Sequence, residues 1–172
     1  LWLGCLEQSL VGKERNLGIP DSSYTASSHY ISPEVKNDAR YEPHNAKLNG
    51  SNGWATKTLV DPDDYLQIDL GTPRIITAVA TQGNGFYDEW VTSYKVNHTS
   101  NLKNWTTYPE NHFLKIFDGN TDRYTVVRHN LKKTITARYI RFIPVSYHTY
   151  KTMRVNVYVN GQLQGMHLTF WK

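Results

Sequence analysis

The chain has 172 residues, which fits one compact domain of ordinary size. Its 39% hydrophobic and 13% aromatic content excludes a disordered or collagen-like chain, and no apolar run approaches the roughly 20 residues of a membrane-spanning helix. The net charge of +4 is unevenly distributed, because no acidic residue follows Asp122. The cationic residues beyond that point are Arg123, Arg128, Lys132, Lys133, Arg138, Arg141, Lys151, Arg154 and Lys172.

This basic C-terminal part predicts attraction to an anionic partner if its side chains share one face. Anionic lipid, sulfated glycan and nucleic acid are the three partners of that kind. Nucleic acid is the weakest of them, because the chain has no zinc-finger, RRM-type or helix-based recognition motif. The alternative is that the cations are scattered around a sheet and only keep it solvated.

A helical turn is expected only at residues 37–41, and strands are predicted from residue 65 onward. Within 65–70 the side chains of Leu66, Ile68 and Leu70 share one face, which is typical of a strand with one buried side. We expect residues 71–73 to turn the chain before the next strand. The further predicted strands are 74–82, 91–98, 124–128, 135–143 and 153–159.

The connections between these strands are rich in Gly, Pro, Asn and Asp. They lack the i, i+3, i+4 apolar stripe of the crossover helices that a parallel α/β fold requires. The sequence therefore predicts an all-β, antiparallel sandwich.

Three N-x-[ST] sequons, at Asn49, Asn97 and Asn104, predict a glycosylated, extracellular chain. The cysteine count points the other way, because Cys5 stands alone and secreted domains more often carry an even number. Cys5 is either buried as a small hydrophobe, paired with another chain, or left without its partner.

Several blocks of residues occur in a characteristic order and spacing. They are Cys5, 19–22 (IPDS), 24–28 (YTASS), 45–49 (NAKLN), 53–55 (GWA), 65–71 (YLQIDLG), 77–83 (TAVATQG), 90–96 (WVTSYKV), 117–121 (FDGNT), 137–144 (ARYIRFIP) and 153–155 (MRV). Together they resemble the discoidin family, also called the coagulation factor V/VIII type C domain. The resemblance covers nearly the whole chain, and blocks in the correct order are far more specific than any one of them.

The resemblance implies an eight-stranded antiparallel jelly-roll β-sandwich over residues 1–160, followed by a C-terminal tail at 161–172 that has no place in the family pattern. The family normally closes its termini with a disulfide between the cysteine matched by Cys5 and one just after the last strand. Here that second position falls near Asn160 and holds no cysteine. Closing so long a loop is typically worth about 2–4 kcal/mol, so we expect packing to offset its absence or the partner of Cys5 to lie outside this chain.

Members of the family are mostly non-catalytic modules that bind cell-surface proteins, glycans or anionic phospholipids through loops at one end. The resemblance therefore implies an extracellular, secreted or cell-surface adhesion module with a protein or glycan ligand. The alternative is peripheral binding to anionic phospholipid membranes that contain phosphatidylserine. A third hypothesis is a structural spacer without a ligand.

The candidate ligand-binding loops follow Ser28 and Gly83. The first contains Tyr30 and Ile31, and the second contains Phe86, Tyr87 and Asp88. We expect the two aromatic side chains of the second loop either to be presented to a ligand or to fold back and cap the sandwich. Asp88 and Glu89 beside them oppose an anionic surface, which weakens the lipid alternative.

Two more segments, 54–64 and 146–151, are predicted to border the same end. Tyr147, His148 and Tyr150 provide aromatic area and hydrogen-bonding groups suited to a sugar or a peptide, or else pack among themselves. We expect Trp54 to belong to the core rather than to a ligand platform.

Asp61, Asp63 and Asp64 are weak candidates for a calcium site, because carboxylate oxygens suit that ion. They lack the spacing of an EF-hand loop, so a solvated turn is expected instead. No other cofactor is predicted.

An enzyme is not expected. Residues 83–88 hold only the first two glycines of a dinucleotide fingerprint and open no helix, so they do not match a Rossmann loop. The chain has no G-x-S-x-G elbow, H-E-x-x-H pair or P-loop, and its seven histidines are dispersed.

Overall fold

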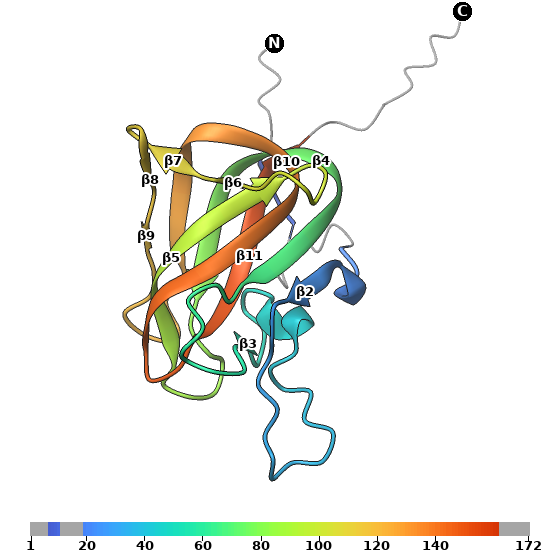
Figure 1. The fold of residues 1–172 in the computed structure, drawn as a ribbon, viewed down its shortest axis with the longest axis vertical. Coiled ribbons are helices and arrows are strands. Elements are labelled where there is room, and N and C mark those ends of the chain that lie inside the picture. Colours follow the sequence, from blue (N-terminus) through green and yellow to red (C-terminus); the bar gives the residue numbers. More distant parts are fainter. Residues whose placement is uncertain (1–6, 11–18, 162–172) are drawn as a thin grey trace, which may run out of the picture.

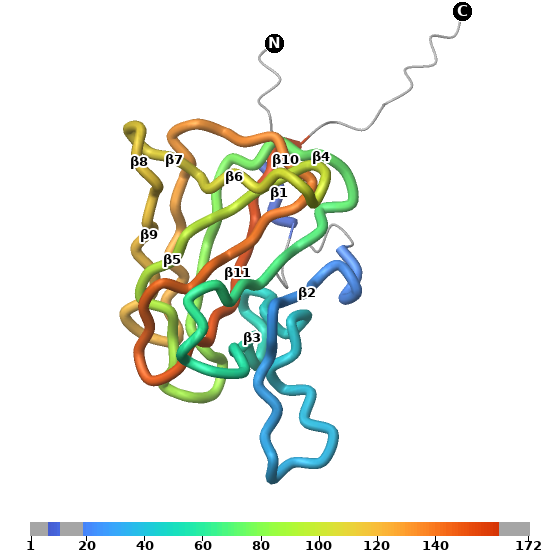
Figure 2. Tube along the Cα trace, in the orientation of Figure 1, coloured from blue at the N-terminus to red at the C-terminus, as the bar shows by residue number. Residues whose placement is uncertain are grey.

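The computed structural model describes residues 7–10 and 19–161, and Figures 1 and 2 show an almost entirely β architecture. Two short 3-10 helices are present, η1 (Asp21–Ser23) and η2 (Pro43–Ala46). The strands are β1 (Glu7–Ser9), β2 (Tyr24–Ala26), β3 (Trp54–Ala55), β4 (Leu66–Gln82), β5 (Trp90–Thr99), β6 (Thr106–Thr107), β7 (Pro109–Glu110), β8 (Phe113–Leu114), β9 (Phe117–Asp118), β10 (Val127–His148) and β11 (Thr152–Asn160). Cys5 and the tail at 162–172 lie outside the described residues. Within the described part, no helix has the length and apolarity needed to cross a membrane.

The long strands β4 and β10 are the centre of the sheet. They pair antiparallel, and the strand order is β1-β11-β4-β10-β5-β6, with β2 added to β4, β3 to β11 and β9 to β5. Register shifts interrupt the β4–β10 ladder, and such irregularities bend strands and increase their twist. The sheet curls on itself as a result, which gives the predicted antiparallel β-sandwich (Figure 1).

Strand boundaries differ from the prediction in two places. The strands predicted at 65–70 and 74–82 are both part of β4, because Gly71 adopts a φ of 78° and bends the chain where a break was expected. β10 likewise contains the strand predicted at 135–143 and the last two residues of the one predicted at 124–128, whose first three residues lie in the preceding connection.

The helical turn predicted at 37–41 is wrong. That segment is an irregular loop in which Asn37 has a φ of 57°, outside the helical region. A helical turn forms instead at Pro43–Ala46, where the fixed φ of proline suits the first turn.

The core lies between the layers of the curled sheet. The alternation read in 65–70 places Leu66, Ile68 and Leu70 inside, as predicted. Trp54 is fully buried, and its indole N–H donates to the carbonyl oxygen of Ser28 at 2.8 Å, so it is a core residue as expected. Other large side chains buried in the core are Ile76, Val79, Val91, Tyr94, Val96, Ile140, Phe142 and Met153.

The described part of the N-terminal segment is held to the last strand by hydrogen bonds. β1 pairs antiparallel with the end of β11, with Glu7 opposite Asn160. The amide of Leu10 donates to the carbonyl of Val157 at 2.9 Å, and the Arg128 guanidinium binds the Glu7 carboxylate. This pairing holds the described N-terminal strand beside Asn160, near the position where the family resemblance implies a disulfide.

Candidate functional site

Three loops meet at one end of the molecule. They are the long connection from β2 to β3, the connection from β4 to β5, and the connection from β10 to β11 (Figure 1, lower end). The β7–β8 hairpin lies at the other end. The segments around Tyr30 and Phe86, predicted to share one end, do so.

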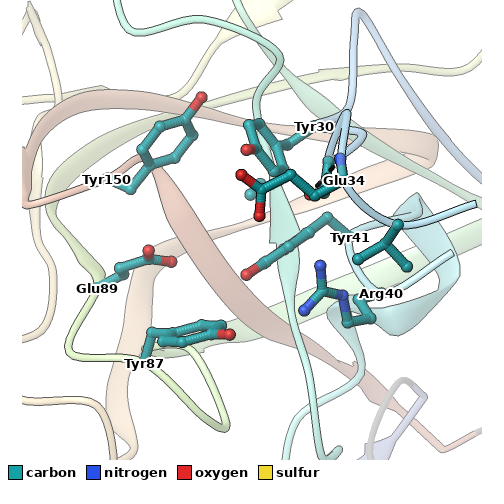
Figure 3. Close-up of a pocket in the computed structure, with 10 residues that line it drawn as sticks. Tyr30, Glu34, Arg40, Tyr41, Tyr87, Glu89 and Tyr150 are labelled. Carbon is teal, nitrogen blue, oxygen red and sulfur yellow. Dashed lines mark hydrogen bonds between the residues drawn. The ribbon is translucent and has the colours of Figure 1, made fainter. Parts of the chain in front are cut away.

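A cleft of about 350 Å³ opens between these loops (Figure 3). Four tyrosines and three charged side chains shape it, each loop contributing at least one. The lining residues are Tyr30, Ser32, Glu34, Val35, Arg40, Tyr41, Ala55, Tyr87, Glu89 and Tyr150. Cavities of this size suit small ligands or a single unit of a larger one.

Asp38 determines the shape of the first loop. Its buried carboxylate accepts hydrogen bonds from the backbone amides of Ser32 and Arg40, at 3.0 and 3.2 Å. It also binds the Arg40 guanidinium through two bonds, of 2.8 Å from Nε and 3.1 Å from Nη2. The hydrogen bonds from the Arg40 side chain hold the pKa of this carboxyl well below its usual range. The loop is therefore closed around a charged pair, and the charge of Arg40 is balanced before any ligand arrives.

Three of the tyrosines pack against one another along the cleft. The Tyr30 ring meets the rings of Tyr41 and Tyr150 edge to face, with centroids 5.5 and 5.7 Å apart. Tyr41 is only 7% exposed, and its hydroxyl points across the cleft toward Glu89 (Figure 3). Burial raises the pKa of Tyr41 to about 12, and the Glu89 carboxylate adds to the rise. This hydroxyl therefore stays protonated at neutral pH and can both donate and accept hydrogen bonds.

Glu89 is fixed in place by its own loop and by β11. Its Oε2 accepts hydrogen bonds from the amide of the buried Asn84 at 2.8 Å and from the hydroxyl of Thr152 at 3.0 Å. The side-chain oxygen of Asn84 in turn accepts from the backbone amide of Phe86 at 2.9 Å. Asn84 thus fixes the position of the Glu89 carboxylate and of the backbone at the exposed tip of the β4–β5 loop.

Arg154 ties three segments together beneath the loops. This residue of β11 is 5% exposed, and its guanidinium donates to the carbonyl oxygens of Gly83 and Gly50, each at 2.6 Å, and of Arg123 at 2.8 Å. Burial lowers its pKa to about 10. A charge held by carbonyls from separate segments fixes the loop bases relative to one another.

The structure brings together three of the predicted binding residues, Tyr30, Tyr87 and Tyr150. Phe86 stands at the rim and is 68% exposed, so it does not fold back onto the sandwich. Ile31 is 58% exposed and lies outside the cleft lining.

Asp88 is also exposed, and its carboxylate lies 3.2 Å from the Arg123 guanidinium. Its negative charge is therefore partly balanced by a cation from the neighbouring segment.

Tyr147 and His148 are not part of the cleft. Both lie at the end of β10, where the His148 ring stacks on Trp90 with centroids 4.1 Å apart. Tyr147 lines a separate groove with residues that include Val60 and Lys95.

Four charged or aromatic lining residues are absent from the predicted ligand contacts: Glu34, Arg40, Tyr41 and Glu89, the last of which was predicted only as an acidic residue of the second loop. The first three lie in or next to the segment expected to form a helical turn, and no periodic pattern marks them. For the fourth, the signal available was its position beside the loop residues already selected.

Two of the three aspartates proposed as weak calcium ligands have other partners. Asp64 is buried, accepts hydrogen bonds from the hydroxyls of Ser27 and Ser28 at 2.9 and 2.8 Å, and lies 3.4 Å from the Lys151 ammonium. Asp61 accepts from the backbone amide two residues on. Among residues 7–10 and 19–161, no three acidic, His or Cys side chains lie close enough to hold a metal ion.

The sequons differ in their surroundings. Asn49 and Asn104 are exposed in connections between strands, whereas Asn97 is half-buried within β5 and its side-chain oxygen is buried. Glycosylation is therefore sterically easier at Asn49 and Asn104 than at Asn97.

The basic C-terminal part does not form one unpaired patch. Arg138 donates two hydrogen bonds to the Asp69 carboxylate, each of 2.8 Å, and Lys132 binds Glu110. The Arg141 guanidinium lies over the Tyr65 ring, 3.7 Å from its centroid. These three cations contact residues of the sheet and its edges and do not line the cleft.

Comparison with known proteins identifies relatives along most of the chain. The family model described as F5/8 type C domain matches residues 23–157. Lactadherin of Mus musculus is 35% identical over 159 residues, which is 90% of this chain and 33% of lactadherin. Contactin-associated protein 1 of Homo sapiens is 36% identical over 148 residues, 85% of this chain and 10% of that protein. The chain thus spans a third or less of the length of these curated relatives.

Solved structures share the fold. Discoidin II from Dictyostelium discoideum superposes with a TM-score of 0.64 at 27% identity, covering 81% of this chain and 55% of that one. The family 32 carbohydrate-binding module of NanJ from C. perfringens, solved in complex with galactose, gives a TM-score of 0.59 at 19% identity, with 89% and 99% of the two chains covered. Both likenesses agree with the β-sandwich seen here.

Proposed function

This chain belongs to the F5/8 type C (discoidin) domain family, and on that premise we propose that it is a non-catalytic, extracellular module that mediates adhesion by binding a cell-surface glycan or protein in the cleft at its loop end. The observation that carries the proposal is the cleft itself, which is built by three loops distant in sequence and lined by four tyrosines. Tyrosine offers a large contact area and a hydroxyl at a small entropic cost.

The size of the cleft favours a compact ligand group. A volume of about 350 Å³ is at the lower end of the range for small-molecule sites and suits one saccharide unit or one side chain of a partner. The loops are also well supported, since Asp38, Asn84 and Arg154 fix them with hydrogen bonds. A preformed cleft limits the ordering cost of binding.

Attachment of cells to the immobilised chain tests this proposal. Tyr87→Ser removes an exposed ring from the cleft wall, and we expect it to abolish most attachment and to remove binding to glycan-array spots. Phe113→Ser is the matched control, because Phe113 is a 79% exposed aromatic residue on the hairpin at the other end. Equal attachment by both variants would support a structural spacer instead.

Binding to anionic phospholipid is the second candidate. It is favoured by the apolar side chains exposed at the rim, Ile31, Val35 and Phe86, which can enter an interface. Sedimentation with vesicles that contain or lack phosphatidylserine separates the two candidates. Binding that requires phosphatidylserine and is lost in Phe86→Ser would replace the first proposal with this one.

A further inference from the structure

The charges around the cleft do not balance. Glu34 and Glu89 both line it, and neither forms an ion pair with any cation of the described chain. Arg40 is the cation in the lining, but its guanidinium is held by the Asp38 carboxylate. The cleft therefore presents two carboxylates without a compensating positive charge.

The aromatic walls strengthen the same preference. The negative faces of tyrosine rings attract a cation within about 6 Å of the ring centroid, and aromatic cages bind ammonium groups in this way. Figure 3 shows Tyr30, Tyr41, Tyr87 and Tyr150 placed around the carboxylates of Glu34 and Glu89. Rings and carboxylates thus converge on one volume.

The Glu89 carboxylate also acts on two of the hydroxyls of the cleft, those of Tyr150 and Tyr41. Burial is the main cause that raises the pKa of Tyr150, with Tyr30 and Glu89 adding to it. Tyr41 shows the corresponding effect from Glu89. The Glu89 carboxylate therefore acts on tyrosines of two different loops.

These features decide between classes of ligand. An anionic group would meet two carboxylates at close range, and a neutral group would gain hydrogen bonds to them but no attraction between opposite charges. A cation gains from both the carboxylates and the rings. The cleft is also wider than a lysine ammonium requires, and its flat rings and hydroxyls match a sugar ring with several polar groups.

We propose that the cleft selects a glycan with a free, protonated amine, so that the ammonium group lies between Glu34 and Glu89 and the sugar ring rests against the tyrosines. This inference rests on the proposed function and names the ligand class for the same site.

Matched oligosaccharides test it by calorimetry on the purified chain. The probes are a β-1,4-linked hexamer of glucosamine and the hexamer of N-acetylglucosamine, which has the same backbone without the charge. We expect the amino hexamer to bind at least tenfold more tightly at neutral pH, with an affinity that falls as salt is added. Equal affinities, or tighter binding of the acetylated hexamer, would overturn the inference.

Two charge-neutralising variants locate the effect. Glu34→Gln changes an exposed side chain, and Glu89→Gln keeps an oxygen that accepts from Asn84 and Thr152, so both should fold. Each should weaken binding of the amino hexamer about three- to tenfold and leave the acetylated one unchanged. The control is Glu110→Gln at the distant hairpin, where Glu110 binds Lys115 and Lys132. Loss of affinity in the control alone would place the amine elsewhere and contradict the inference.

The outcomes separate this inference from the proposed function. If neutral glycans bind in a Tyr87-dependent manner and the amine adds nothing, the inference fails while the function stands. If a lysine-rich peptide competes more strongly than the amino hexamer, the ligand is a protein and the glycan assignment fails. If no probe binds and cell attachment does not require Tyr87, both fail.

Discussion

The carboxylate of Asp38 controls how the first loop reaches the cleft. It binds two backbone amides and the Arg40 side chain, and Tyr41 follows directly in the chain. One buried charge therefore places three lining residues, Ser32, Arg40 and Tyr41. None of them would be held at the cleft by an extended, unsupported loop of the same length.

Asp38→Asn should loosen this loop and remove the pH-dependent stabilisation that the Asp38 carboxylate provides. Because the pKa of Asp38 is lowered in the folded state, its stabilisation is complete above the ordinary pKa near 4 and is lost as the pH falls through the depressed value. We expect the variant to unfold about 2–4 °C below the wild type at pH 7, and the gap to shrink steadily below about pH 4. Calorimetric unfolding at several pH values measures it.

The exposed Asp63 provides the matched control for this measurement. Asp63→Asn should leave the unfolding temperature at pH 7 unchanged. A gap for Asp38→Asn that persists unchanged at pH 2 would show that the charge of this carboxylate is not what supports the loop.

Among the elements, the loop between β4 and β5 depends on close backbone contact. A Cβ added to Gly85 would lie 2.2 Å from the carbonyl oxygen of Ser51, closer than van der Waals contact allows. The backbone amide of Gly85 also donates to the carbonyl of Asn52 at 3.2 Å. The absence of a side chain at this position therefore lets two loops touch and sets the position of Tyr87 and Glu89.

Gly85→Ala should displace this loop, at a cost of about 1–3 kcal/mol in the free energy of unfolding, because backbone atoms have to move. Ligand binding in the cleft should weaken in parallel. Gly71→Ala is the informative comparison, since Gly71 has a φ of 78° in β4 with no atom within 4 Å of the added Cβ. It should cost about 1–2 kcal/mol through backbone strain and leave cleft binding intact.

Denaturant unfolding and calorimetry with the amino hexamer or a bound array glycan distinguish the two variants. Cleft binding that survives Gly85→Ala but fails in Gly71→Ala would show that the contact between the loops is irrelevant to the site.

The elements also show what the sequence could predict. The alternation of apolar and polar residues identified the buried face of β4, because every second side chain of a strand points to the same side of the sheet. It did not show that β4 and β10 continue through their bends, because continuity depends on pairing with a partner strand. The prediction of a helical turn at 37–41 was wrong for a related reason. The Asp38 carboxylate accepts hydrogen bonds from the backbone amides of Ser32 and Arg40, and these bonds override the local helical propensity.

The candidate site, like the strands, could be predicted only in part. Tyr30, Tyr87 and Tyr150 could be selected because the family blocks locate their loops and tyrosine is a typical contact residue. The presence of Glu34 and Glu89 in one cleft could not be predicted, because residues 55 positions apart share a site only when two loops fold against each other. Tyr147 and His148 were selected with Tyr150 because the whole segment 146–151 was predicted to border the loop end, but they lie at the end of β10 and outside the cleft lining.

At the scale of the whole molecule, the two ends have different roles. β1 and the end of β11 lie away from the cleft, on the side of the β7–β8 hairpin (Figure 2). The cleft end carries the tyrosines, the unpaired carboxylates and the exposed rim. The curled sheet between them is held by the long β4–β10 ladder, so the loops are presented on a rigid base.

The central claim is that cell-surface ligands meet this protein at the cleft end. Site-specific photo-cross-linking on living cells tests it even when the ligand is unidentified, with a photoreactive amino acid placed at position 87 or at position 113. We predict an adduct with a cell-surface molecule from position 87 and none from position 113, since these exposed aromatic positions lie at opposite ends. Adducts from position 113 alone would contradict the account.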